Sequence, residues 1–124
     1  MRIITKSVSV TTTGDPASAT GSSTLPGMTG FLLDVYLDYN ASAPGATTDV
    51  TVAYTTRGGN LLAVSNTATD ALVAPRQKLV DNTNTAISNS DALFPLNQAL
   101  TVTVAQSNAL TACLVATFRI LILG

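Results

Sequence analysis

Apolar and polar residues alternate with a period of two along most of this chain, and helical spacing is nearly absent. Such alternation is typical of β-strands with one buried and one exposed face. The pattern predicts strands over residues 7–11, 31–39, 49–56, 99–105 and 111–123. In the second of these, one face is expected to carry Leu33, Val35, Leu37 and Tyr39, and the other face Asp34, Tyr36 and Asp38.

Glycine and proline punctuate these segments and predict the connections between them. Arg57-Gly58-Gly59-Asn60 is followed by a short apolar segment, Leu61 to Val64. Because primed turns require positive φ, two glycines at this place predict a β-hairpin. Pro75 lacks a backbone N–H, so residues 71–80 are expected to form an edge strand or two short pieces. Residues 81–91 are predicted to be a loop.

The first thirty residues are expected to bury little surface. Residues 2–5 are predicted to be a loose N-terminal arm ahead of the first strand. Residues 12–30 consist mainly of Thr, Ser, Gly and Ala with two prolines, which predicts an extended surface loop. The arm and the loop are therefore the segments whose backbone groups are most available to a neighbouring protein.

These elements predict an all-β protein, an antiparallel β-sandwich or jelly roll of seven to eight strands. One domain is expected over residues 1–124, with the extended arm and loop within residues 1–30. A chain of this length can bury roughly two-thirds of its unfolded surface. Neither a repeat of fixed period nor a change of composition divides it.

The composition favours a protein that acts through its shape and surfaces. The chain has no His, no Glu and no Trp, and its one cysteine, Cys113, stands in an apolar segment. Because enzymes draw most of their bases, nucleophiles and metal ligands from such residues, no catalysis, cofactor or metal is expected. Cys113 is expected to be a buried small hydrophobe without an intramolecular disulfide.

Charge is sparse. Only 10% of the residues are charged, against roughly 25% in ordinary globular domains, which indicates that other protein covers part of the surface. The net charge is −1 and the basic residues are scattered, so nucleic-acid binding is not expected. No secretion signal is evident, and the apolar stretch from Ala112 to Leu123 is too short and too polar to span a bilayer. A soluble protein made inside a cell, without a membrane partner, is expected.

Two polar features invite a functional interpretation. Asp34, Asp38 and Asp49 could ligate Ca²⁺ or act as a glycosidase pair, but their spacing favours a polar strand face and a turn cap. Arg76 has two interpretations that the sequence leaves open. It anchors an interface through its guanidinium, or it is an edge-strand charge that discourages unwanted pairing.

Five segments follow one another in a characteristic order along the chain. They are TTTGDPASATGSS (11–23), GFLLDVYLDYN (30–40), SAPGATTDVTVAY (42–54), APRQKLVDN (74–82) and FPLNQALTVTVAQSNA (94–109). In this order, over nearly its whole length, the chain resembles the small β-sandwich decoration, or cement, proteins of tailed-bacteriophage capsids. The resemblance implies a homotrimer on the outer face of an icosahedral shell, bound to the major capsid protein at or near local three-fold positions. It also implies synthesis in the host cytoplasm and residence on the capsid exterior.

An extended segment can add to a sheet edge of a neighbour, so the N-terminal arm and the adjoining loop (12–30) are expected to make intersubunit or coat contacts. The interface residues expected on this basis, together with the arginine discussed above, are Met1, Arg2, Ile3, Ile4, Lys6 and Arg76. One alternative is a carbohydrate-binding jelly roll of a tail fibre or lectin, which would stack sugars on Tyr36, Tyr39 or Tyr54. Another is a fibre subunit that polymerises by strand exchange.

Overall fold

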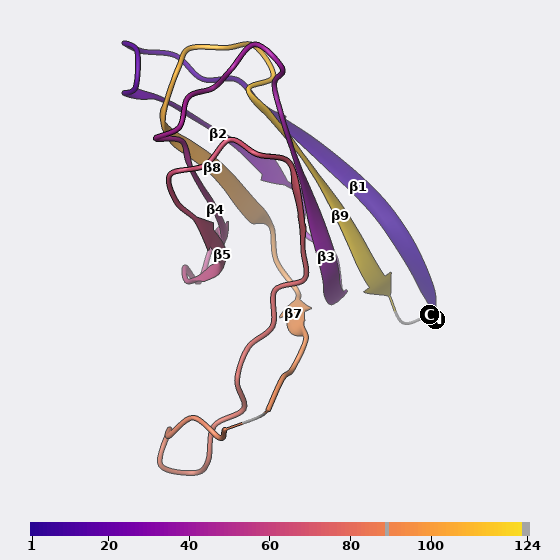
Figure 1. The fold of residues 1–124 in the computed structure, drawn as a ribbon. Helices are drawn as coiled ribbons and strands as arrows, with labels where there is room; N and C mark the ends of the chain where they lie inside the picture. The colour runs from indigo at the N-terminus through magenta and orange to yellow at the C-terminus, as the bar shows by residue number, and fades with distance from the viewer. Residues whose placement is uncertain (89, 123–124) are drawn as a thin grey trace.

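The computed structural model describes residues 1–88 and 90–122, and in this part of the chain the protein is all-β without a helix. Nine strands make up the regular structure (Figure 1). They are β1 Arg2–Val10, β2 Ala19–Leu25, β3 Gly30–Tyr39, β4 Asp49–Tyr54, β5 Asn60–Val64, β6 Ala71–Val73, β7 Phe94–Leu96, β8 Leu100–Ser107 and β9 Leu114–Ile122.

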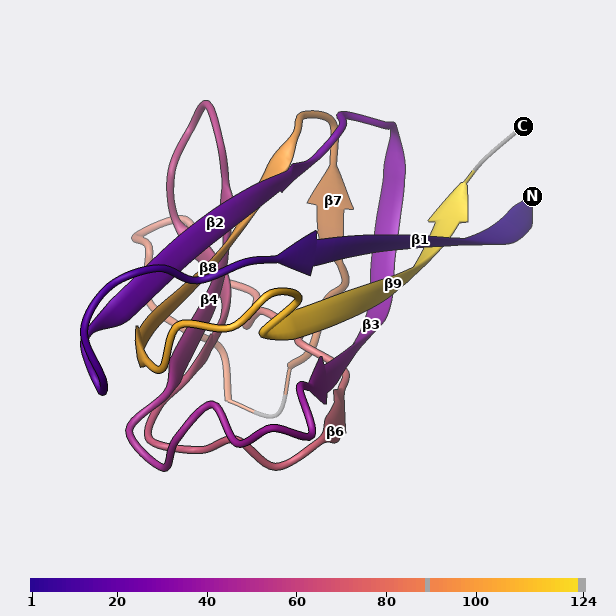
Figure 2. The same cartoon turned by 90° about the horizontal axis from the view of Figure 1, so that it is seen from above.

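The strands form two antiparallel sheets, which Figure 2 shows from above. The five-stranded sheet has the order β1-β9-β3-β6, and β7 also pairs with β3. The four-stranded sheet has the order β2-β8-β4-β5. β1 pairs with β9 without interruption from Arg2 opposite Ile122 to Val10 opposite Leu114. The first and last strands of the described chain therefore lie side by side.

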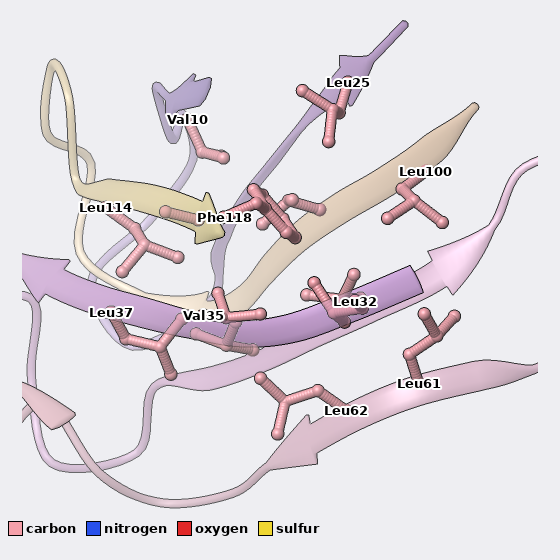
Figure 3. Packing of buried hydrophobic residues seen from close by; sticks show 14 of the residues in the cluster. Val10, Leu25, Leu32, Val35, Leu37, Leu61, Leu62, Leu100, Leu114 and Phe118 are labelled. Atoms are coloured by element: carbon pink, nitrogen blue, oxygen red, sulfur yellow. The ribbon is translucent and has the colours of Figure 1, made fainter. Parts of the chain in front are cut away.

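The hydrophobic core lies between the two sheets. Leu32 and Phe118 from the five-stranded sheet are fully buried, as are Val52 and Val102 from the four-stranded sheet. Figure 3 shows side chains from both sheets meeting in this layer. Because burying one such side chain contributes roughly 1.5–3 kcal/mol, this layer is the main source of stability.

Most of the predicted strands are confirmed. β3, β4, β8 and β9 occupy the segments in which apolar and polar residues alternate, and Val50, Val52 and Tyr54 are buried as expected. The hairpin is confirmed too, because β4 and β5 pair and the turn glycines, Gly58 and Gly59, have φ of 80° and 95°. Leu123, the last residue of the predicted C-terminal strand, lies outside the described residues, as does Gly124.

The predictions for the N-terminal region are wrong in two places. Residues 2–5 are not a loose arm, because they belong to β1 and pair with β9. Residues 12–30 are not one surface loop, because their middle forms β2, which pairs with β8. Only Ala19 and Leu25 of β2 are buried, so the strand has no apolar alternation to reveal it. Its polar side chains bond instead: Thr20 Oγ1 donates to the Val104 carbonyl oxygen at 2.8 Å.

The predicted faces of β3 are wrong at its first half. The pairing of β3 with β9 shifts between Leu32 and Asp34, so Leu33 is an extra residue in a bulge. Leu32 takes the inward place that the alternation assigned to Leu33, and it is fully buried. From Val35 to Tyr39 the faces are as predicted.

The described residues form nine strands, more than the seven to eight expected, because two three-residue strands, β6 and β7, pair with different parts of β3 on the side away from β9. β6 ends before Pro75, which agrees with the short edge strand that the proline predicted. Residues 81–88 and 90–91 form turns, a bridge and irregular structure, in agreement with the predicted loop. Asn89 lies outside the described residues.

Candidate interaction surfaces

β1 lies at the edge of the five-stranded sheet and carries four of the expected contact residues, Arg2, Ile3, Ile4 and Lys6, with Met1 just before it. In the described part of the chain, β9 is the only strand that pairs with it. Near its C-terminal end β2 covers β1, since Ser23 Oγ donates to the Ser9 carbonyl oxygen at 2.6 Å. Over residues 2–7 no described strand other than β9 pairs with this edge, so its outward backbone N–H and C=O groups are available to a further strand.

The side chains of this edge point to both sides of the sheet. Ile3 is 56% exposed and pairs with Leu121 on the outer side. Arg2 and Lys6 share the other side, and both are exposed although Lys6 pairs with the buried Phe118. Ile4 is half-buried and packs against the core. The edge therefore offers two cations four residues apart, on the same side of one strand.

The solvent-facing side of the five-stranded sheet, here called the outer face, is poor in charge. The strand registers align Ser7, Thr117, Tyr36 and Leu72 in one row across four strands. Tyr36 is 40% exposed and Leu72 is 64% exposed. These two neighbouring side chains give the row an exposed apolar end.

The corresponding side of the four-stranded sheet has a different chemistry. Its rows place Ser22 and Thr51 opposite Thr103, and Thr24 opposite Thr101. These hydroxyl groups can bind water, so this surface is polar although it has no charge in these rows. Of the two sheets, the five-stranded one therefore presents the surface better suited to an apolar contact.

One ion pair crosses the outer face. Arg119 Nε on β9 donates to the two carboxylate oxygens of Asp34 on β3, at 2.9 and 3.0 Å, and Nη2 donates to one of them. Asp34 is only 6% exposed. The hydrogen bonds from Arg119 lower the pKa of Asp34 below its ordinary 3.8 and outweigh the opposing effect of burial. The two charges neutralise each other, so the outer face stays close to uncharged at this point.

Arg76 does not lie with the other expected contact residues. Its Nη1 donates to the carbonyl oxygens of Leu33 and Pro75, both at 2.9 Å. Leu33 is the bulged residue of β3, so Arg76 fastens the segment after β6 to this bulge. β9 and β3 separate that position from β1. The anchoring and edge-protecting interpretations of Arg76 both stay predictions.

The three carboxylates singled out in the sequence are spread over two sheets. Asp34 is engaged by Arg119, and Asp49 on β4 accepts a hydrogen bond from the Asn66 backbone N–H at 3.0 Å. Asp38 is exposed on β3. Over residues 1–88 and 90–122, no three Asp or Cys side chains gather as a metal site would require.

An open depression of about 750 Å³ lies at one end of the fold, between residues 38–46 and 68–70. Asp38, Asn40 and Asp70 give it polar groups, and alanines form much of its rim. The Asp70 carboxylate accepts a hydrogen bond from the Tyr39 backbone N–H at 2.8 Å. Tyr39 also lines the depression, but its ring is buried and its hydroxyl has no hydrogen-bond partner in the structure. Burial raises the pKa of that hydroxyl, and the Asp70 charge adds to the rise.

The three tyrosines differ in what they can offer to a ligand. Tyr39 and Tyr54 are 6% and 4% exposed, as their inward positions predicted. Tyr54 donates its hydroxyl proton to the Pro95 carbonyl oxygen at 2.6 Å. Tyr36 alone among them presents a ring to solvent, and it lies on the outer face.

Sequence reasoning missed a further set of exposed apolar residues. Leu79, Val80 and Ile87 are 50%, 52% and 46% exposed. All three lie in a segment that projects beyond the ends of both sheets (Figure 1). A signal was present, since branched apolar side chains are out of place in a stretch rich in Asn, Thr and Ser.

The fold and these surfaces define a class of protein: an all-β chain of two antiparallel sheets in which, over the described residues, the edge strand β1 pairs along one side only and the outer face carries Tyr36 and Leu72. The chain matches no protein-family model, no curated protein and no solved structure. Within the part of the chain that the structure describes, no helix has the length and hydrophobicity needed to cross a membrane.

Proposed function

We propose that this chain is a capsid decoration protein that binds the outer face of an icosahedral phage shell and bridges coat subunits as a homotrimer. The observation that carries the proposal is the uncovered edge of β1 beside the charge-poor outer face. An edge strand supplies affinity through backbone hydrogen bonds, and a neighbouring apolar face adds buried area. The resemblance of the sequence to capsid decoration proteins supplies the setting.

The order of the strands supports this proposal. Apart from the short β7, eight strands form two sets of four, β1-β9-β3-β6 and β2-β8-β4-β5. We interpret this arrangement as a jelly roll, the eight-stranded double-sheet architecture that viral capsid and lectin domains share. A fold class alone does not determine function, so the argument depends on the surfaces.

The charges on β1 favour a partner other than a second β1. If two copies of β1 paired antiparallel about Ile4, Arg2 of each would face Lys6 of the other. Like charges directly opposite each other destabilise a strand pair. A segment with acidic residues four positions apart would instead complement both cations. We therefore infer that β1 accepts an extended acidic segment of the coat protein.

Three such contacts made by one trimer would act together. Each contact can bury roughly 1,000 Å² or less and still hold, because linking the sites raises the effective concentration of the second and third. A trimer that spans a junction between coat subunits would add buried area across it. This is the mechanism by which we propose that the chain strengthens the shell.

The test compares two charge reversals of equal size. The binding partner is a particle of the parent virus made without this protein. We expect Lys6→Glu, on the β1 edge, to lower the affinity for these particles about tenfold or more. Arg57→Glu, in the turn between β4 and β5, should bind as the unchanged chain does. Deleting residues 1–6 is a poorer test, because it also removes pairing with β9.

Circular dichroism and thermal melting of both variants verify that each still folds. Quantitative mass spectrometry of purified virions should find the chain at an abundance comparable to that of the coat protein. Absence from particles, or equal binding by the two charge-reversal variants, contradicts the proposal.

The open depression favours a second candidate, a carbohydrate-binding module of a tail fibre or lectin. Asp38, Asn40 and Asp70 could bind sugar hydroxyls. The depression lacks an exposed aromatic ring, which such sites usually use as a platform. A glycan array would support this candidate if it shows specific binding that Asp38→Ala removes.

A further inference from the structure

The projecting segment between β6 and β7 forms a hydrogen-bonded ribbon (residues 77–88 and 90–92). It is called the arm from here on and is distinct from the N-terminal arm expected from the sequence. Gln77 and Ala92 exchange backbone hydrogen bonds of 2.9 and 2.8 Å at its base. Farther out, the Ile87 N–H donates to the Leu79 carbonyl oxygen at 2.8 Å. The arm therefore has a defined backbone that can present side chains in fixed positions.

The Asp81 carboxylate closes the end of the arm. It accepts hydrogen bonds from the Thr83 N–H and hydroxyl and from the Thr85 N–H, at 2.8, 2.7 and 3.0 Å. These bonds lower the pKa of Asp81 below its ordinary 3.8. The base has an anchor of its own, because Arg76 bonds to the bulge of β3.

The arm has no core to stabilise it. Its three large apolar residues, Leu79, Val80 and Ile87, are about half exposed and do not belong to the core cluster. A two-stranded ribbon is at best marginally stable alone in water. The arm extends away from the two sheets (Figure 1), and about half of each of these side chains is exposed. A second molecule that packs on the arm would bury the exposed part of these side chains.

The outer face of the same chain carries a complementary surface. Leu72 on β6 pairs with Tyr36 on β3, and the two side chains are 64% and 40% exposed. Exposed carboxylates stand two residues away from each, Asp38 beyond Tyr36 and Asp70 before Leu72. On the arm, the exposed cation Lys78 precedes Leu79. In residues 1–88 and 90–122 the one ion pair is between Asp34 and Arg119, so Asp38 and Lys78 have no ionic partner within the described chain. Asp70 already accepts a hydrogen bond from the Tyr39 backbone N–H.

We propose that the arm of one copy packs on the outer face of the next copy, with Leu79 and Ile87 against Leu72 and Tyr36 and with Lys78 beside Asp38. The contact joins two different surfaces, so it is heterologous, and the three-fold symmetry of the proposed trimer would close it into a ring. Each copy then gives one arm and receives another. This inference deepens the proposed function by naming the contact between copies, and it rests on that function only for the number of copies.

Self-association of the purified full chain, measured by sedimentation equilibrium without capsids, tests the contact. The unchanged chain should have a mass of several 12.7 kDa units, three if the ring is a trimer. Leu79→Ser with Ile87→Ser, and separately Leu72→Ser, should each weaken association about tenfold or more. Ile3→Ser is the matched control, since Ile3 is similarly exposed on the outer face but lies on β1; it should associate normally.

A charge exchange tests the orientation of the contact. Lys78→Asp should weaken association, and adding Asp38→Lys to the same chain should restore it, which a general effect on folding cannot do. Melting temperatures show that each variant folds. The proposal is overturned if the unchanged chain is monomeric at about 100 μM, if the arm and face variants associate normally, or if the exchange fails to restore association. A monomer that still binds particles through β1 would overturn the arm contact and the homotrimer but leave capsid binding standing. Loss of particle binding in Ile3→Ser with normal self-association would leave the arm contact standing.

Discussion

Arg119 and Asp34 are 85 residues apart in the sequence, yet they lie directly opposite each other on β9 and β3. The guanidinium bonds both carboxylate oxygens, and Asp34 is almost completely buried beneath it. The pair sits at the bulge of β3, where the regular ladder is interrupted. It therefore fixes the register of the two strands at the point where the ladder specifies it least.

We expect removal of this pair to destabilise the fold in an asymmetric way. Asp34→Asn leaves a half-exposed arginine that water can solvate, so the loss should be roughly 1–2 kcal/mol. Arg119→Met leaves a buried carboxylate without its donors, so the loss should be larger. Urea unfolding at pH 7 measures both. A larger loss of stability in Asp34→Asn than in Arg119→Met would contradict this reasoning.

The same pair predicts a dependence of stability on pH. The pKa of Asp34 is lower in the folded chain than its ordinary 3.8. A group of this kind stabilises the fold fully above its unfolded pKa, and the contribution disappears as the pH falls through the lower, folded value. Unfolding measured between pH 6 and pH 2 should therefore show a loss of stability below about pH 4. In Asp34→Asn that part of the loss should be absent.

Replacement of either of two glycines by alanine should destabilise the fold, for a different reason in each case. A Cβ at Gly30 would lie 2.4 Å from the Leu121 carbonyl oxygen, and the neighbouring strand would have to move, so Gly30→Ala should cost about 2–3 kcal/mol. Gly58 has open space around it but a φ of 80°, so Gly58→Ala should cost about 1–2 kcal/mol. Asparagine tolerates this φ, and Gly58→Asn should recover part of that loss. Chemical denaturation of the three variants checks these values.

The hydroxyl of the buried residue Thr12 should contribute to the stability of the fold. Its Oγ1 donates to the Asn108 carbonyl oxygen at 2.7 Å and accepts from the Leu110 N–H at 3.0 Å. Thr12→Val keeps the shape but leaves both backbone groups without this partner, so we expect a loss of about 1–3 kcal/mol. Thr24→Val, at an exposed position of β2, should change stability by less than about 0.5 kcal/mol. Equal effects of the two changes in thermal unfolding would show that the hydroxyl of Thr12 is not important.

Cys113 should report on the opening of the fold. The thiol is fully buried, with its Sγ 3.3 Å from Ser107 Oγ. A thiol reagent in excess should label the folded chain slowly, at a rate set by opening, and label it at once in denaturant. Core variants that lower stability should raise the labelling rate in proportion. Immediate labelling of the native chain would contradict the burial of this residue.

The strands that the sequence predicts well are those whose apolar residues alternate. The alternation of Val50, Val52 and Tyr54 predicts β4 because each of these side chains enters the core. Gly58 and Gly59 predict the turn because glycine takes positive φ more readily than other residues. β2 could not be found in this way, since hydroxyl hydrogen bonds such as that of Thr20 replace apolar contacts along it. Its place is set by β8, which lies about eighty residues away in the sequence.

The candidate surfaces are less visible in the sequence than the core. A bulge such as that at Leu33 moves side chains from one face to the other, and nothing local to β3 specifies it. The outer face brings Tyr36 and Leu72 together through strand pairing alone. Residues 2–5 do not alternate between apolar and polar, so the local pattern predicts no strand there, but pairing with β9 orders them.

The pairing of Arg2 with Ile122 means that the two ends of the described chain meet on neighbouring strands at one corner of the sheet (Figure 2). A short linker could join them without disturbing either sheet, and new ends could be opened in the turn at Gly58 and Gly59. Such a circular permutant should keep the same core while changing which strand is made first. A cargo peptide inserted in that linker would stand at the rim, away from the arm and from Leu72.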